Sequence, residues 1–292
     1  MAAGRFAWVL NLDADLELAA RHAYTPKQSV REAMKSWTKQ LAASLLGPDD
    51  LLVDESSEPG SARGLVGRAF CPTPRALAML VRAGAEPEPH PSLDVLRLVN
   101  SRAFAASVGP NLPGAELVTS LERASALFAA TPPVGQGWRV KRNFGMTGRG
   151  QRVVATATAT DADLAFVRAG LDEGGVQIEP NVVIVAEYAL HGFIAADGSR
   201  ELGVPVRQHC DARGAWVSTE RLLSVGDMEF VKDLVDEVAC VGAALVRAGY
   251  FGPFGVDAYT YRGAGDTIAF QPRSEINARY SMGFAVGFAH TA

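Results

Sequence analysis

The chain has 292 residues, with 28 Lys and Arg against 32 Asp and Glu, so its formal net charge is −4. Hydrophobic residues make up 48% and charged residues 21%, proportions typical of globular chains long enough to bury a large core. A mildly acidic chain does not attract polyphosphate backbones by bulk charge, so the composition disfavours a general nucleic-acid binder. Any anion must therefore be held by a local site.

The cysteines and the apolar segments bear on the cellular compartment of the protein. Cys71, Cys210 and Cys240 are odd in number and far apart, so they form neither a CxxC pair nor a disulfide framework. No apolar run of about 18 residues is present, and residues 1–12 lack the apolar region and cleavage site of a leader peptide. We therefore expect a cytoplasmic protein that does not enter a membrane.

The first part of the chain alternates strand-like and helix-like segments. Strands are expected over 6–12 and 51–53, and helices over 30–46 and 74–84. Thr73 is the expected cap of the second helix, because Pro74 is tolerated at a first helical position. This order predicts a small α/β domain over residues 1–95.

The rest of the chain mixes helices with strands of a different pattern. Thr119 and Glu122 form a predicted capping box, and Thr160 is a second predicted cap. An apolar stripe at helical spacing from Phe230 to Val246 precedes Gly249, which is suited to a left-handed cap. Helices are expected over 121–130, 160–170 and 230–246, and strands over 138–141, 152–156, 176–178, 181–195, 254–261 and 267–277.

A glycine-rich segment, 143–150, joins two of these predicted strands. Glycines let a backbone approach a phosphate and turn its N–H groups inward. The segment lacks the G-x-x-x-x-G-K-[ST] pattern, and no helix follows it, which excludes both a Walker loop and a dinucleotide fingerprint. What remains is a strand–loop–strand flap with Lys141 just before it; taken alone, the segment is explained slightly better as an ordinary surface hairpin.

The predicted C-terminal hairpin gathers three oxygen-bearing side chains. Glu275 and Asn277 are two residues apart, so they share one face of a strand. A turn near residue 266 places Asp257 across from Glu275, since 266 is the midpoint of their positions. Two carboxylates and an amide suit Mg²⁺, with Mn²⁺ as an alternative, whereas ordinary polar residues on a solvated strand face are the competing explanation.

Together, these pieces resemble the ATP-grasp superfamily of carboxylate–amine ligases. The resemblance covers roughly residues 95–285 and implies an ATP-grasp domain over 96–292. A flap subdomain over about 115–178 and a catalytic subdomain over about 179–292 would form it. The matching pieces are the strand 138–141 with its glycine loop, the segment 176–179, Glu187, the segment 254–257 and the segment 275–279.

The resemblance also implies roles for individual residues. ATP would be held at its phosphates by Lys141 and the flap residues Gly145, Thr147, Gly148 and Gly150. Gln177, Ile178 and Glu179 would bind the adenine edge, partly through backbone groups. Glu187 would accept hydrogen bonds from the ribose hydroxyls. Mg²⁺ would be bound by Asp257, Glu275 and Asn277, and Arg279 would lie beside the transferred phosphoryl group.

Two departures from the family pattern concern its cations. Many members carry a second lysine before the flap, where this chain offers Arg102, which can grip phosphate bidentately. Gly255 replaces an arginine that some ligases place two positions before the first metal carboxylate. The candidates for that missing charge, which would steady the acyl intermediate, are Arg207, Arg273 and Arg279, and Arg273 and Arg279 are the predicted catalytic residues.

The implied reaction joins a small carboxylic acid to an amine through an acyl phosphate. A phosphotransferase on the same scaffold and a non-catalytic ATP-binding module remain open alternatives. Contacts with the substrates are expected from turns of the N-terminal domain, namely Asn11, Asp13, Asp15 and 70–73. The sequence does not fix the two substrates or the oligomeric state, for which a homodimer is one option.

Overall fold

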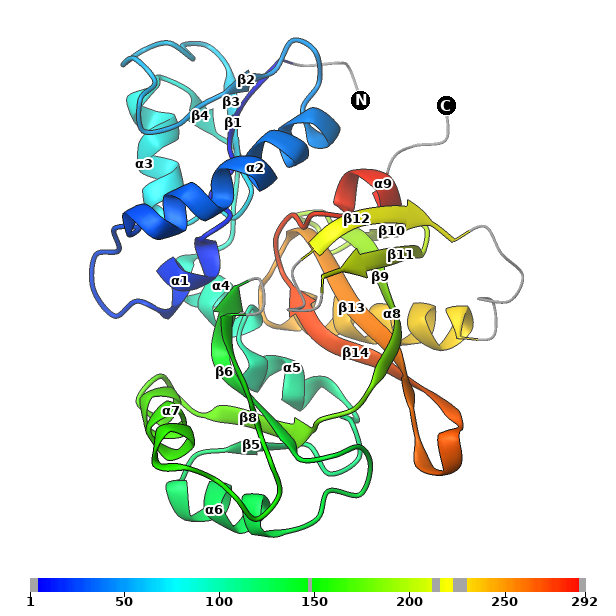
Figure 1. Cartoon of the computed structure of the whole chain (residues 1–292). Coiled ribbons are helices and arrows are strands. Elements are labelled where there is room, and N and C mark those ends of the chain that lie inside the picture. The colour runs from blue at the N-terminus through cyan, green and yellow to red at the C-terminus, as the bar shows by residue number, and fades with distance from the viewer. Residues whose placement is uncertain (1–4, 147–148, 212–215, 223–229, 289–292) are drawn as a thin grey trace.

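The computed structural model describes residues 5–146, 149–211, 216–222 and 230–288. Three sheets organise these residues, and they follow one another along the chain (Figure 1). The N-terminal sheet lies at one end of the view, the second sheet at the other, and the third beside them. Among the described helices, none is both long and apolar enough to cross a bilayer.

The first sheet is parallel, with the strand order β2–β1–β3–β4. Its strands and the helices around it are β1 (Phe6–Val9), β2 (Leu51–Leu52), β3 (Val66–Ala69), β4 (Glu86–Pro87), α1 (Ala14–Ala19), α2 (Gln28–Leu45) and α3 (Pro74–Arg82). Because β1 lies between two neighbours and is covered on both faces, its residues form a continuous apolar run. Thr73 is the N-cap residue of α3 as predicted, but its hydroxyl makes no cap hydrogen bond: it accepts from Asn11 Nδ2 at 3.0 Å and donates to Glu17 Oε2 at 2.6 Å.

The second sheet is antiparallel, with the order β5–β8–β6–β7. Its elements are β5 (Glu116–Val118), β6 (Trp138–Met146), β7 (Arg149–Val154), β8 (Val176–Pro180), α6 (Leu121–Ala129) and α7 (Asp161–Leu171). The pairing of β6 with β7 confirms the predicted strand–loop–strand flap. Thr160 caps α7 in a capping box with Asp163, but α6 is capped by Ser120 in place of the predicted Thr119.

The third sheet has six antiparallel strands in the order β12–β11–β9–β13–β14, with β10 on β9. These strands are β9 (Ile184–Ile194), β10 (Arg200–Leu202), β11 (Val206–Cys210), β12 (Trp216–Arg221), β13 (Gly252–Arg262) and β14 (Ile268–Asn277). Helix α8 (Val231–Arg247) packs its predicted apolar stripe on this sheet, and Gly249 ends it with φ +81°. The remaining helices are α4 (Leu93–Val99), α5 (Arg102–Val108) and α9 (Phe284–Phe288).

Candidate active site

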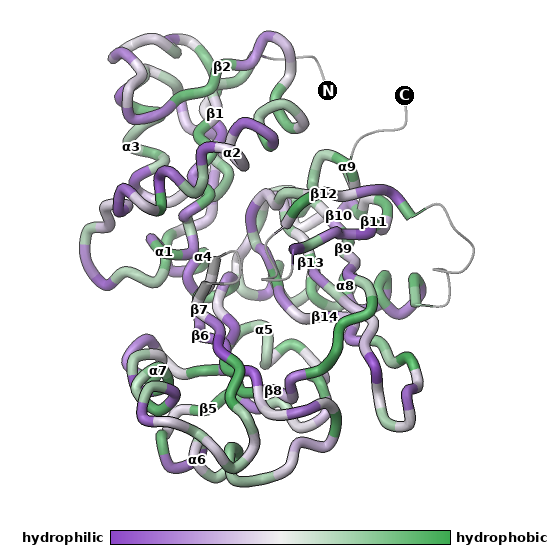
Figure 2. The backbone as a smooth tube through the Cα atoms, viewed as in Figure 1, coloured by the Kyte–Doolittle hydropathy of each residue, from purple (hydrophilic) through white to green (hydrophobic). Residues whose placement is uncertain are grey.

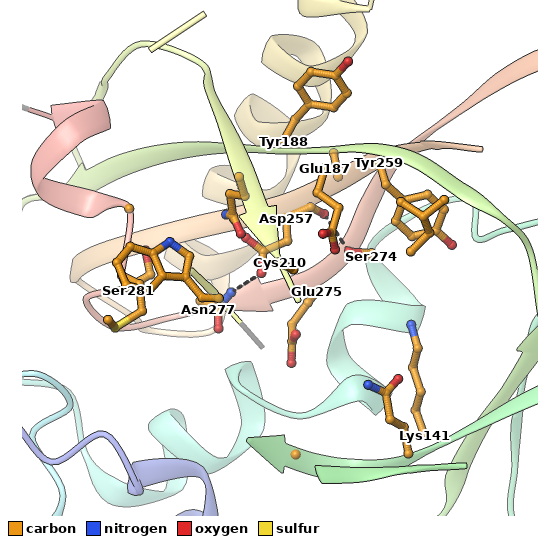
Figure 3. Close-up of a pocket in the computed structure, with 18 of the residues that line it drawn as sticks. Lys141, Glu187, Tyr188, Cys210, Asp257, Tyr259, Ser274, Glu275, Asn277 and Ser281 are labelled. Atoms are coloured by element: carbon orange, nitrogen blue, oxygen red, sulfur yellow. Dashed lines mark hydrogen bonds between the residues drawn. The ribbon is translucent and has the colours of Figure 1, made fainter. Parts of the chain in front are cut away.

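A cavity of about 680 Å³ is lined by strands of the second and third sheets and by residues around the first sheet. Phe70 follows the first sheet, Lys141 belongs to the second, and Asp257 and Glu275 belong to the third. Figure 3 shows Lys141 reaching toward the space below the carboxylates of the β13–β14 hairpin. The cavity therefore depends on parts of the chain that are far apart in sequence.

The predicted oxygen face is present on the β13–β14 hairpin. Asp257 pairs directly with Glu275 in the register of the two strands, as the midpoint argument predicted. Asn277 Nδ2 donates to Asp257 Oδ2 at 2.9 Å, and Gln208 Nε2 donates to Asp257 Oδ1 at 2.9 Å. Ile276, between the two polar residues of β14, is buried in the core, as strand alternation requires.

The charges on this hairpin fit a divalent cation. Burial, and then the negative charge of Glu275, raise the pKa of Asp257 to about 7. Asp257 and Glu275 are partly buried and repel each other, and a cation between them would stabilise both carboxylates. Mg²⁺ prefers such oxygen donors. In the described part of the chain, no group of three His, Cys, Asp or Glu side chains could hold a metal, so this donor set needs the Asn277 amide.

Arg102 lies beside this oxygen face. Its Nη2 donates to Glu275 Oε1 at 3.0 Å, which leaves Glu275 Oε2 for another partner. Arg102 is the first residue of α5 and lines the cavity. The structure therefore brings this arginine close to the three oxygen-bearing residues.

Lys141 and Glu179 form a second cation–carboxylate pair in the cavity. Lys141 Nζ lies 2.6 Å from Glu179 Oε1, and both side chains are largely buried. Burial lowers the pKa of Lys141, while the charge of Glu179 acts in the opposite direction. Gln177 Nε2 donates to Glu179 Oε2 at 3.2 Å and so orients the carboxylate.

The glycine flap reaches the cavity through Gly145 and Gly150. Gly150 has φ +84°, and a Cβ added there would lie 3.2 Å from the Phe144 carbonyl oxygen, so this position favours glycine. The other two predicted flap residues, Thr147 and Gly148, lie outside the described residues. The flap strands themselves are placed as predicted, over the side of the cavity that holds Lys141.

The segment expected to read the adenine reaches the cavity through one of its three side chains. Of Gln177, Ile178 and Glu179, only Glu179 lines the cavity, because Ile178 points into the core of the second sheet. The wall is formed by the next apolar residues, among them Ile184 and Val185, which are 42% and 48% exposed. Figure 2 shows this hydrophobic stretch where the chain passes from β8 to β9.

The remaining predicted acid on this side, Glu187, does line the cavity. It lies on β9 and pairs in register with Tyr259 of β13 and Gln208 of β11. Its carboxylate is therefore on the same wall as the apolar stretch. Glu187 is therefore available to a ligand in the cavity.

The two arginines predicted to be catalytic lie in different places. Arg279 lines the cavity, where Nη2 donates to Asp15 Oδ2 at 2.7 Å. Arg273 is buried away from the cavity lining, and its guanidinium is bonded to Glu237 and to the backbone carbonyls of Ala105 and Pro110. Arg273 therefore holds β14 to neighbouring elements and does not take the expected catalytic position.

The N-terminal turns contribute fewer contacts than expected. Asp15 and Phe70 line the cavity, whereas Asn11 is used to bond Cys71 and Thr73 and so clamps the ends of β1 and β3. Asp13 is paired with Arg75. The structure thus retains Asp15 and Phe70 as candidate substrate contacts.

Sequence analysis missed several lining residues. The main ones are Trp37, Arg139, Gln208, Trp216 and Ser281. Gln208 had one signal, because it directly follows Arg207, which also lines the cavity. The two tryptophans carried no local pattern that separates them from core residues.

Comparisons with known proteins were made on both sequence and structure. No protein-family model and no curated protein matches the sequence. The structure is similar to biotin carboxylase from Campylobacter jejuni in complex with β-γ-ATP, with a TM-score of 0.56 and 13% identity over 96% of this chain and 67% of that chain.

Two further enzymes show the same likeness. N5-carboxyaminoimidazole synthetase from Staphylococcus aureus, complexed with ADP, has a TM-score of 0.52 and 12% identity over 94% of this chain and 70% of that one. Pyruvate carboxylase from Rhizobium etli has a TM-score of 0.54 and 15% identity over 98% of this chain and 27% of that one. These are ATP-grasp enzymes, so the predicted ATP-grasp fold is confirmed.

Proposed function

We propose that this ATP-grasp chain is an ATP- and Mg²⁺-dependent ligase that joins a small carboxylic acid to an amine. The observation that carries the proposal is the meeting of Asp257, Glu275 and Asn277 in one cavity with Lys141 and Arg102. Phosphoryl transfer requires oxygen ligands for a cation and, beside them, cationic side chains that can bind phosphate.

ATP would lie along the wall formed by the second and third sheets. Its adenine would rest on the apolar stretch that includes Ile184 and Val185, and its ribose hydroxyls would donate to Glu187. Lys141 and Arg102 would hold the phosphates under Gly145 and Gly150 of the flap. The nucleotide complexes of the Campylobacter and Staphylococcus enzymes support this use of the fold.

The oxygen face would hold the metal between the carboxylates of Asp257 and Glu275 and the amide oxygen of Asn277. Bound Mg²⁺ would neutralise negative charge that develops on the phosphoryl oxygens. Asn277 is suited to this position because its amide nitrogen is turned toward Asp257, which leaves the oxygen available (Figure 3). Gln208 holds the other oxygen of Asp257 in place.

The reaction would proceed in two transfers. An oxygen of the substrate carboxylate attacks the γ-phosphorus of ATP, ADP leaves, and an acyl phosphate forms. The amine nitrogen then attacks the carbonyl carbon and loses a proton, and inorganic phosphate leaves as the amide forms. Arg279 would orient the carboxylate for both steps, and the flap would keep water from the acyl phosphate.

A measurement of ADP release with panels of acids and amines tests this proposal. Glu275→Gln should abolish ADP release while the far-UV circular dichroism stays unchanged. Glu201→Gln is the matched control, because Glu201 is exposed on β10 outside the cavity lining. Full activity of Glu275→Gln would remove the metal assignment.

The same assay separates the two alternatives. A phosphotransferase would release ADP without an amine and would accumulate a stable phosphorylated product. A binding module would take up ATP and Mg²⁺ but release no ADP with any acid and amine. Dependence of ADP release on both substrates is the outcome that the ligase proposal requires.

A further inference from the structure

One end of the cavity is walled by large apolar side chains that the nucleotide does not need. Trp37 comes from α2, Phe70 follows β3, Trp216 begins β12, and Met282 precedes α9; we call these four residues the aromatic end. Ser281, beside Met282, lies on the other side of Asn277 from Lys141 in Figure 3. The aromatic end is thus separated from the proposed phosphate site by the oxygen face.

The aromatic end is more open than the protein core. Phe70 is buried, but Trp37, Trp216 and Met282 are each only partly buried while they line the cavity. They come from three distant parts of the chain and are not one strand or helix turned inward. Apolar and aromatic walls with a few placed polar groups are typical of small-molecule pockets.

A polar group at this end lacks a partner. Ser281 lines the cavity and is 9% exposed, and its hydroxyl has no hydrogen-bond partner among the described residues. A buried hydroxyl without a partner costs free energy, so such a group usually meets a ligand or a water molecule. The Ser281 oxygen itself is closed off from the cavity and lies beside Gly255, so a ligand at this end must be held by other groups.

Arg279 supplies the charge for an anion at the same place. Its Nε and Nη2 donate to Asp15, and its Nη1 donates to the carbonyl oxygen of Tyr280. A guanidinium has five N–H groups, so one N–H on each terminal nitrogen remains for a carboxylate. Arg279 also lies over the ring of Phe70, with 5.1 Å from its Cζ to the ring centroid.

We infer that the carboxylate substrate of this enzyme carries an aromatic ring. Its carboxylate would accept from Arg279, next to the oxygen face. Its ring would pack against Trp37, Phe70 and Trp216, whose flat apolar surfaces suit another ring. This inference rests on the proposed function and adds the class of acid to it.

Isothermal titration of the full chain tests the inference with two matched pairs of acids. The pairs are phenylalanine with alanine, and 3-phenylpropanoate with propanoate. At least one aromatic acid should bind about tenfold more tightly than its own aliphatic counterpart, the scale of discrimination that an apolar pocket provides. Less than threefold preference in both pairs would overturn the inference.

Variants locate the preference within the cavity. Trp37→Leu should reduce the aromatic-to-aliphatic ratio of affinities several-fold, whereas Lys39→Ala, on an exposed turn of the same helix, should not change it. Trp216→Leu provides a second test if the first variant fails to fold, with the exposed Val217→Ala as its control. An unchanged ratio in a folded tryptophan variant contradicts the assignment.

Binding of a non-hydrolysable ATP analogue in the same samples separates the two proposals. If the analogue binds and no aromatic preference is found, only the acid class is overturned. If the analogue does not bind, the proposed function fails, and an aromatic preference measured without nucleotide would still support this pocket.

Discussion

Arg279 and Asp15 meet across 264 positions of the sequence, with Nη2 and Nε of the arginine donating to the two carboxylate oxygens at 2.7 and 3.3 Å. Asp15 lies in α1, which follows β1 of the first sheet, and Arg279 follows β14 of the third sheet. Burial disfavours the charge of Arg279, but the carboxylate of Asp15 outweighs it and raises the pKa of the guanidinium. The pair therefore holds two parts of the chain together at the cavity.

We expect Asp15→Asn to lower the free energy of unfolding by about 3 kcal/mol, because it leaves the Arg279 charge buried without its partner. The control is Asp236→Asn, which removes the exposed pair with Lys232 and should change stability by less than about 0.5 kcal/mol. Urea unfolding followed by circular dichroism measures both. Equal effects of the two substitutions would show that the buried pair contributes no more to the free energy of unfolding than the exposed pair.

Lys141→Ala should weaken binding of an ATP analogue by about 1.5–3 kcal/mol, roughly ten- to 150-fold, as for loss of a charged hydrogen bond. Arg142→Ala is the matched control, because Arg142 is the next residue of β6 and pairs with Glu173 outside the cavity. Calorimetry gives both affinities. An affinity for the Lys141 variant equal to that of the control would remove Lys141 from the nucleotide site.

His191 should make stability depend on pH. Its ring is fully buried, and burial lowers its pKa from 6.5 to about 4, so the unfolded chain binds a proton between these values that the folded chain does not. Neutral His191 makes its full contribution to the free energy of unfolding above about pH 6.5. This contribution, about 3 kcal/mol in total, is lost as the pH falls to about 4.

The measurement is urea unfolding at pH 7.5 and at pH 5. His191→Leu cannot take up the proton and should lose this part of the pH dependence, whatever its own stability. His22→Leu, at an exposed position, should keep it. Identical pH dependence in the parent chain and His191→Leu would argue against a depressed pKa.

Ser120→Ala should cost about 1 kcal/mol of stability, because the Ser120 hydroxyl accepts from the Arg123 backbone N–H at the start of α6. Thr119→Ala, one residue earlier and exposed, should cost little. Thermal or urea unfolding of the two variants compares them. The opposite ranking would restore the cap that the sequence pattern favoured.

The sequence predicted those parts of the site that depend on local geometry. Asp257 and Glu275 belong to one hairpin, so a turn position and strand alternation were sufficient to place them opposite each other. The flap followed in the same way, because β6 and β7 are joined by a short glycine-rich segment. Local periodicity also placed α8 and its glycine cap.

Burial and long-range pairing could not be predicted in this way. Arg273 resembles Arg279 in sequence context, but α8 supplies Glu237 to the first and the N-terminal part supplies Asp15 to the second. The difference arises from which element packs on which, and the sequence pattern does not contain that information.

The cavity pairs each of three cations with an acid of its own: Lys141 with Glu179, Arg102 with Glu275 and Arg279 with Asp15. A bare polyanion entering this space would meet repulsion from the acids, and a bare divalent ion would meet repulsion from the bases. When nucleotide and metal enter together, the phosphates can pair with the bases and the metal with the acids, so the charges remain balanced. These three paired charges therefore favour joint uptake of nucleotide and metal, each raising the affinity for the other.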